Sequence, residues 1–168
     1  MRAGHGVHAD AGRTVFVGSV KSFVKKSICL RADAELVDGG VYMILVTGGC
    51  FQGKTQYACG TFGVGSGDTA DGAVCPLEEL YRTKLLYHFH EYIRRLMEAG
   101  EEFSLERLWA ENPEVILVTN ELGCGVVPAD RFDRAYREQT GRICCRIAKE
   151  ASQVHRVVCG IGTVIKDG

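Results

Sequence analysis

The stretch that decides the fold is Gly48-Gly49-Cys50-Phe51-Gln52-Gly53-Lys54-Thr55. It satisfies the pattern G-x-x-x-x-G-K-S/T, in which x is any residue. Directly before it stands the apolar run Tyr42-Met43-Ile44-Leu45-Val46, which is short enough for a buried strand. The residues from Lys54 to about Cys59 then open a predicted helix. The spacing therefore predicts a phosphate-binding loop between a strand and a helix.

Each residue type in this loop has a physical reason to bind phosphate. The glycines let the backbone curl so that successive N–H groups point at one anion, and the N-terminus of the following helix adds a positive dipole. Lys54 is predicted to reach the β- and γ-phosphates as a catalytic residue, and Thr55 is predicted to bind Mg²⁺. We therefore expect Mg²⁺ together with ATP or GTP. The predicted nucleotide-binding residues are Gly48, Gly49, Cys50, Phe51, Gln52, Gly53, Lys54 and Thr55.

Two further segments predict strands of the same sheet. One is Val115-Ile116-Leu117-Val118-Thr119, and the other extends from Val154 to Cys159. Helices are predicted before each of them, a short one that Ser104 caps and that ends before Pro113, and a long one that Asp130 caps. This alternation predicts an α/β fold of the P-loop NTPase type, with a mostly parallel sheet flanked by helices.

The middle of the chain predicts a loop and then one long helix. Residues 60–67 contain four glycines in eight positions, which predicts a flexible loop. Pro76 fits a first helical position, and the helical pattern continues to about Glu98 before Gly100. One face of this predicted helix carries Leu77, Tyr81, Leu85, His88, Tyr92 and Leu96.

Composition and charge exclude several classes of protein. The 168 residues, 46% of them hydrophobic, are enough for one domain with its own core. The net charge of −1 provides no overall positive field that would attract nucleic acid or anionic lipid. No apolar run approaches the roughly 20 residues of a membrane span, and Lys21, Lys25 and Lys26 interrupt the segment where a signal peptide would be apolar. We therefore expect a cytoplasmic protein with no nucleic-acid partner and no membrane span.

The first forty-odd residues differ from the rest of the chain. They contain apolar patches such as Thr14-Val15-Phe16-Val17 but no continuous helical stripe. Met43 stands at the start of the first predicted strand, so translation from Met43 would still yield a nearly complete strand. We interpret residues 1–42 as an extension that is disordered, adds a strand or two, or reflects an upstream start site. Residues 43–168 are interpreted as the nucleotide-binding domain.

A P-loop enzyme usually adds an acidic residue at the end of a second strand, to hold the metal shell or to orient water. Two acids compete for this role. Glu121 follows the predicted strand 115–119 and so lies at the sheet edge where ligands of open α/β sheets bind. Asp71 follows the polar segment Gly67-Asp68-Thr69-Ala70 and lacks an apolar strand in front of it. Position therefore favours Glu121 as a catalytic residue.

Several segments resemble the bifunctional adenosylcobinamide kinase and adenosylcobinamide-phosphate guanylyltransferase family. The first is residues 43–49 followed by Gly53-Lys54-Thr55, and the second is the more specific run 118–128, Val-Thr-Asn-Glu-Leu-Gly-Cys-Gly-Val-Val-Pro. The resemblance covers about residues 43–57 and 114–166, and residues 58–113 carry no convincing match. Further matching positions are Arg137, Gly141, Arg142 and the ending 157–162.

The resemblance implies an enzyme of cobalamin biosynthesis. Such an enzyme phosphorylates the aminopropanol hydroxyl of adenosylcobinamide, a corrinoid substrate, and then attaches GMP through a guanylylated histidine. It also implies a homo-oligomer. The family's guanylyl-accepting histidine lies between the P-loop and the V-T-N-E run, where this chain is shortened and offers His88 and His90.

On one helix these two histidines would point about 200° apart, so at most one could face a given site. His88 shares the apolar stripe, which favours a core position. His90, one turn before Arg94, is therefore the better candidate for the catalytic nucleophile.

Three functions remain open from the sequence. The first is an adenosylcobinamide kinase-like phosphotransferase that uses ATP or GTP, with guanylyltransferase activity undecided. The second is a nucleotide-binding regulatory module without turnover. The third is a P-loop kinase for another hydroxyl substrate, which the unmatched middle of the chain would select.

Overall fold

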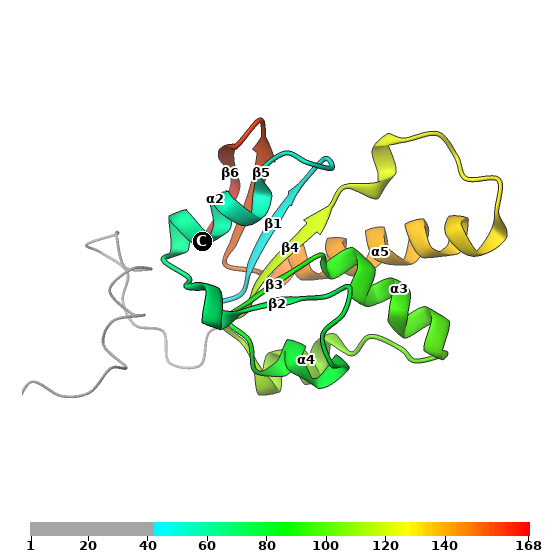
Figure 1. The fold of residues 1–168 in the computed structure, drawn as a ribbon, viewed down its shortest axis with the longest axis horizontal. Helices are drawn as coiled ribbons and strands as arrows, with labels where there is room; N and C mark the ends of the chain where they lie inside the picture. Colours follow the sequence, from blue (N-terminus) through cyan, green and yellow to red (C-terminus); the bar gives the residue numbers. More distant parts are fainter. Residues whose placement is uncertain (1–41) are drawn as a thin grey trace, which may run out of the picture. The chain divides into compact units, whose positions relative to one another are not determined.

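The computed structural model of the protein describes residues 42–168, so the predictions for residues 1–41 lie outside the described residues. The described chain forms a six-stranded sheet with the order β2-β3-β4-β1-β5-β6 (Figure 1). The strands are β1 (Ile44–Gly48), β2 (Thr69–Asp71), β3 (Leu85–Tyr87), β4 (Ile116–Asn120), β5 (Gln153–Val158) and β6 (Ile161–Asp167).

The pairing confirms the mostly parallel sheet that the sequence predicted. β1 lies at the centre and pairs in parallel with β4 on one side and β5 on the other. β2 and β3 continue the parallel arrangement beyond β4. β6 is the exception, because it returns from a tight turn after β5 and pairs antiparallel at the sheet edge. The three strands predicted from the sequence correspond to β1, β4 and β5.

Within residues 42–168 four α-helices connect the strands, and two of their N-caps were predicted. Ser104 Oγ accepts a hydrogen bond from the backbone N–H of Arg107, and an Asp130 carboxylate oxygen accepts one from that of Asp133. Both bonds satisfy N–H groups that have no partner inside the helix. The helices are α2 (Lys54–Phe62), α3 (Phe89–Ala99), α4 (Leu105–Glu111) and α5 (Arg131–Glu150).

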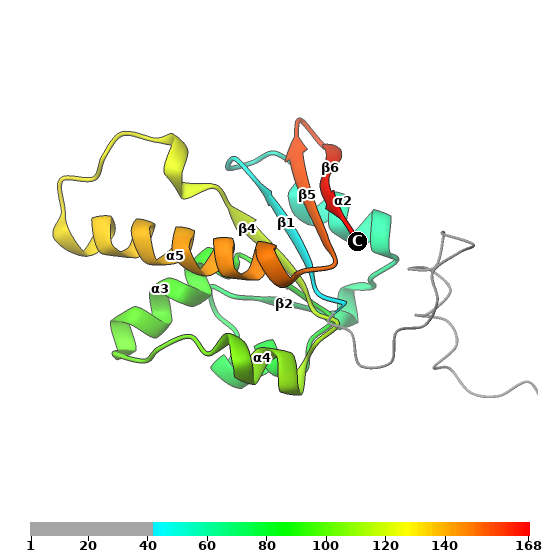
Figure 2. The same ribbon diagram turned by 180° about the vertical axis from the view of Figure 1, so that it is seen from behind.

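The strands send alternate side chains into two apolar layers. Leu45 and Leu117 face the layer built with α3, α4 and α5. Ile44, Val46 and Val118 face the layer built with Ala58 of α2. Figures 1 and 2 accordingly show α2 on one side of the sheet and the other three helices on the opposite side. Because both faces are covered, the central strands read as continuous apolar runs.

The predicted long helix from Pro76 to Glu98 is wrong. A short 3-10 turn (Leu77–Tyr81) comes first, β3 follows at Leu85–Tyr87, and only then does α3 begin. His88 lies between β3 and α3 in the left-handed region, with a φ of 52°. Leu85, Tyr92 and Leu96 of the apolar stripe are buried, but they belong to a strand and a helix in succession and not to one helix face.

Two predictions for residues 60–71 also need correction. Residues 60–62 form the last turn of α2, so only part of the glycine-rich stretch is a loop. Thr69–Asp71 forms β2, in parallel register with β3. Asp71 therefore does end a strand, contrary to the interpretation of its polar surroundings. A strand of three residues stabilised by its neighbour needs no apolar run of its own.

The carboxyl ends of the parallel strands meet at one edge of the sheet. β1 ends at Gly48, β4 at Asn120, β2 at Asp71, and β3 runs directly into His88. This edge is where open α/β sheets bind their ligands. Within residues 42–168 no helix is long and apolar enough to cross a bilayer.

Candidate functional site

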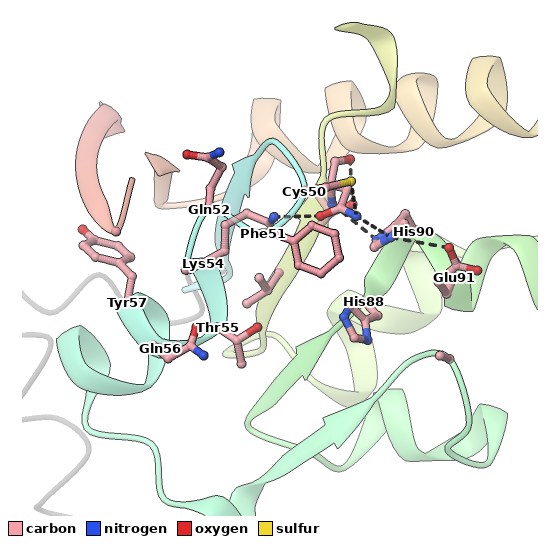
Figure 3. Close-up of a pocket in the computed structure, with 16 residues that line it drawn as sticks. Cys50, Phe51, Gln52, Lys54, Thr55, Gln56, Tyr57, His88, His90 and Glu91 are labelled. Atoms are coloured by element: carbon pink, nitrogen blue, oxygen red, sulfur yellow. Dashed lines mark hydrogen bonds and ion pairs between the residues drawn. The ribbon is translucent and has the colours of Figure 1, made fainter. Parts of the chain in front are cut away.

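A cavity of about 870 Å³ lies at this edge of the sheet (Figure 3). Residues 50–57 of the phosphate loop and of α2 form one wall. His88, His90 and Glu91 form the facing wall, and residues 118–120 of β4 lie between the two. The cavity therefore joins the predicted nucleotide site to both histidines of the central segment.

The phosphate loop is anchored to the turn between β5 and β6. The backbone N–H of Cys159 donates to Gln52 Oε1 at 2.6 Å, and that of Gly160 donates to the Gln52 carbonyl at 2.9 Å. Gly53 takes a φ of 75° just before α2 begins. A Cβ on Gly48 would lie 2.3 Å from the Val157 carbonyl oxygen, so the loop approaches β5 too closely for any side chain. These contacts fix the curvature of the loop, which is the backbone form typical of phosphate-binding loops.

Lys54 is buried at the centre of the loop. Its Nζ donates to the Gly49 carbonyl at 2.6 Å and to Asn120 Oδ1 at 2.7 Å. Burial lowers the pKa of Lys54, and the nearby Cys50 opposes this by raising it. The ammonium is thus kept at the loop by two neutral oxygen acceptors, which an anionic phosphate would replace with a stronger partner.

His90 lies next to this lysine rather than on an exposed helix face. Asn120 Nδ2 donates to His90 Nε2 at 2.8 Å, and the Asn120 carboxamide oxygen at the same time holds Lys54. The His90 side chain is only 5% exposed. Burial, together with the nearby His88 and Lys54, lowers its pKa to about 4, and Asp71 opposes this shift. The ring is therefore neutral at physiological pH.

The lowered pKa of His90 predicts a loss of stability in mild acid. The native state takes up the His90 proton only near pH 4, whereas an unfolded histidine does so near pH 6.5. The unfolded state therefore binds more protons between these values, and the free energy of unfolding falls as pH drops from 6.5 to 4. Urea titrations at several pH values should show a shallower fall for His90→Gln than for the unchanged protein. Equal pH dependence in both would contradict this assignment.

His88 has the opposite environment. Its side chain is 49% exposed, and its Nδ1 lies 2.8 Å from an Asp71 carboxylate oxygen. The expectation of a core position for His88 is therefore wrong, because His88 precedes α3 instead of lying on a helix face. A carboxylate that accepts from Nδ1–H leaves Nε2 as the basic ring nitrogen. The structure thus forms an Asp–His pair on the wall that faces the phosphate loop.

Glu121 lies at the predicted sheet edge but its side chain is directed elsewhere. Its backbone N–H donates to the Gly48 carbonyl at 2.9 Å, while its carboxylate pairs with Arg156 at 3.3 Å. The residue lines a second cavity beside α5 and is not among the lining residues of the first. Asp71 does not line the first cavity either, but it contacts that cavity through His88.

Two of these side chains were not predicted as site residues from the sequence. Asn120 connects Lys54 to His90, and its position at the end of an apolar strand was a usable signal. Asp71 was set aside because β2 carries no apolar run. The sequence signal for Asp71 was indirect. Only when Leu85-Leu86-Tyr87 is known to be β3 does His88 mark a strand end, next to which Asp71 ends the neighbouring strand β2.

This fold, with a phosphate loop between β1 and α2 and a buried lysine at its centre, defines a P-loop nucleotide-binding α/β protein. The family model described as cobinamide kinase / cobinamide phosphate guanyltransferase matches residues 79–165, more than half of the chain. The chain belongs to this family. The match includes residues 79–113, where no convincing resemblance was expected, and it begins after the phosphate loop.

Two curated relatives carry the same kind of name. The bifunctional adenosylcobalamin biosynthesis protein CobU of Salmonella typhimurium is 49% identical over 53 residues, which cover 32% of this chain and 29% of that protein. The protein of the same name from Escherichia coli is 47% identical over 53 residues, with the same shares of the two chains. The aligned segment thus spans under a third of either relative.

Proposed function

We propose that the protein transfers the γ-phosphate of ATP or GTP to the aminopropanol hydroxyl of adenosylcobinamide, as a kinase of cobalamin biosynthesis. One observation carries the proposal. The buried ammonium of Lys54 and the His88 ring belong to facing walls of one cavity, and Asp71 holds that ring through its Nδ1. A kinase needs little covalent chemistry, so a phosphate cradle and a group that positions and deprotonates a hydroxyl are sufficient.

In this proposal the loop N–H groups and Lys54 bind the β- and γ-phosphates. The acceptor oxygen forms a bond to the γ-phosphorus, the bond from that phosphorus to the β–γ bridging oxygen breaks, and the nucleoside diphosphate leaves. The hydroxyl proton passes to His88 Nε2, while Asp71 holds Nδ1 and stabilises the resulting imidazolium. Lys54 neutralises the charge on the transferred group.

Mg²⁺ fits this site through Thr55 and the nucleotide. The Thr55 hydroxyl belongs to the cavity wall beside Lys54. Residues 42–168 contain no cluster of three or more His, Cys, Asp or Glu that could hold a metal unaided. Bound Mg²⁺, held by Thr55 and the nucleotide, would neutralise the charge that develops on the phosphates. Of the two acids, we favour Asp71 over Glu121 for a supporting role, because Arg156 already engages Glu121.

The experiment is to incubate the protein with γ-labelled ATP or GTP, with and without adenosylcobinamide, and to follow label into the corrinoid. We expect corrinoid-dependent transfer. His88→Asn and Asp71→Asn should slow it strongly, whereas Glu121→Gln should have a smaller effect. Tight nucleotide binding without transfer would instead support a regulatory module, and transfer only to another hydroxyl compound would support a different P-loop kinase.

Guanylyl transfer is a second candidate activity, with His90 as the nucleophile. The neutral ring of His90 is two hydrogen bonds away from Lys54, through the Asn120 side chain. A neutral imidazole nitrogen would form a bond to the α-phosphorus of GTP, and pyrophosphate would leave. For this step Nε2 has to exchange its hydrogen bond with Asn120 for the phosphorus.

Labelling with α-labelled GTP distinguishes the two histidines. Protein-bound label that survives base, is released by acid and disappears only in His90→Ala would support His90. Label that disappears only in His88→Ala would transfer this role to the exposed histidine. No protein-bound label in the unchanged protein would contradict guanylyl transfer while leaving the kinase proposal standing.

We further propose a cytoplasmic homo-oligomer. Support comes from β6, whose Ile161, Val164 and Ile165 expose much of their surface, and from Val126 and Val127 in the segment before α5. Exposed apolar side chains of this number favour an interface with another copy. Light scattering after size-exclusion chromatography tests this, and a monomer at micromolar concentration would contradict it.

A further inference from the structure

Phe51 is the most unusual residue of the phosphate loop. Its aromatic ring is fully exposed, although large apolar side chains are normally covered. Its backbone has a φ of 56°, in the left-handed region that a bulky residue rarely adopts. The ring therefore has neither a packing role nor an intrinsic backbone preference that explains its position. Strained backbone of this kind concentrates at ligand sites.

The ring belongs to the acceptor side of the cavity. Figure 3 draws Phe51 between Lys54 and His88, and both residues line the same cavity with it. Because Lys54 and Thr55 bind the β- and γ-phosphates, this region holds the end of the nucleotide from which phosphate is transferred. A molecule that receives the γ-phosphate must therefore pass next to Phe51.

We propose that the Phe51 ring is the contact surface for the flat, weakly polar ring system of the phosphate acceptor. This inference rests on the proposed kinase function and names how the acceptor is recognised. Many of the other side chains that line the cavity are polar, among them Lys54, Thr55, His88 and His90, whereas Ala73 is small and Val118 is buried. The polar side chains can position a hydroxyl and phosphates, but they offer little apolar surface to a macrocycle. An exposed aromatic ring provides that surface by stacking and by removing apolar area from water.

The test is a set of substitutions at Phe51, measured for acceptor KM, kcat, nucleotide Kd and melting temperature. Phe51→Ala should raise the acceptor KM about tenfold, with nucleotide Kd and kcat at saturating acceptor nearly unchanged. Phe51→Trp keeps a ring and should restore a KM close to that of the unchanged protein. Phe51→Gly should raise KM as alanine does, yet should not lower the melting temperature, because glycine adopts positive φ without strain. Val74→Ala, at an exposed apolar residue that does not line the cavity, is the matched control.

Three results would overturn the inference. One is an unchanged acceptor KM in Phe51→Ala. Another is a raised nucleotide Kd in Phe51→Ala with no change in acceptor KM, which would mean that the ring contacts the purine base. The third concerns a protein without turnover. If the protein shows no turnover, equilibrium dialysis with adenosylcobinamide, detected by its visible absorbance, tests the Phe51 contact separately from the kinase function. If corrinoid binding weakens in Phe51→Ala, Phe51 is a contact surface for the corrinoid even though the kinase proposal has failed. If corrinoid binding is absent, or is the same in Phe51→Ala, the inference about Phe51 is overturned as well.

Discussion

Replacing Lys54 with alanine is expected to lower kcat/KM for phosphate transfer by roughly a thousandfold. Lys54 is the buried cation of the described phosphate loop, and its Nζ lies within 2.7 Å of both Gly49 and Asn120 oxygens. It is therefore held in place before the nucleotide arrives, and its charge acts where solvent screens it weakly. Alanine removes the charge that offsets the negative charge of the transferred phosphate.

The matched control is Lys84→Ala, since Lys84 is an exposed lysine that pairs with Asp68 away from the cavity. That variant should keep nearly full activity, because exposed ion pairs contribute little. Initial rates with γ-labelled nucleotide and circular dichroism should be measured for both variants. Lys54→Ala should remain folded, because the lost bonds are made to a backbone carbonyl and a carboxamide that water can reach through the cavity. A folded Lys54→Ala variant with near-normal transfer would contradict the proposed site.

The parts of the fold that sequence predicted are those with strong local signals. β1 and β4 are continuous apolar runs, and the caps at Ser104 and Asp130 are made by residue types that compete well for exposed helix N–H groups. The phosphate loop was predicted because motif and flanking elements agreed at one position. In each of these cases a few consecutive residues contain the necessary information.

The parts that sequence did not predict depend on neighbours in space. β2 and β3 have three residues each, and they are stabilised mainly by parallel pairing to one another and to β4. Leu85-Leu86-Tyr87 fits both a helical stripe and a buried strand, so periodicity could not separate the two. Because β3 was predicted as part of a helix, no strand was available with which residues 69–71 could pair, and the strand end at Asp71 was not predicted.

The site was predicted in part for the same reason. Lys54 and Thr55 follow from one motif, whereas Asp71 and His88 are 17 residues apart and meet only because β2 and β3 are adjacent in the sheet. The exposure of His88 and the burial of His90 likewise depend on where α3 begins, which is Phe89 and not the predicted Pro76. The directions of the His88 and His90 side chains are therefore set by the position of β3 in the sheet and by the start of α3.

Replacing Gly48 with alanine is expected to lower the free energy of unfolding by about 3 kcal/mol and to abolish measurable nucleotide binding. The new Cβ would lie 2.3 Å from the carbonyl oxygen of Val157. That oxygen belongs to β5, which pairs with β1, so neither strand can move apart without loss of the central sheet pairing. The loop itself would have to shift, and its N–H groups would no longer converge on one phosphate.

Gly49→Ala is the matched control because it adds the same atom one residue later. There the nearest atom, Gln52 Cγ, lies at 3.5 Å, which is ordinary van der Waals contact. Guanidinium titrations and nucleotide titrations of the two variants should therefore differ sharply, with Gly49→Ala close to the unchanged protein in stability. If both variants bound nucleotide equally well, close approach of the loop to β5 would not be what shapes the phosphate site. If both lost binding with intact stability, the glycines would be needed for contact with phosphate itself, and the sheet would play no part in the effect.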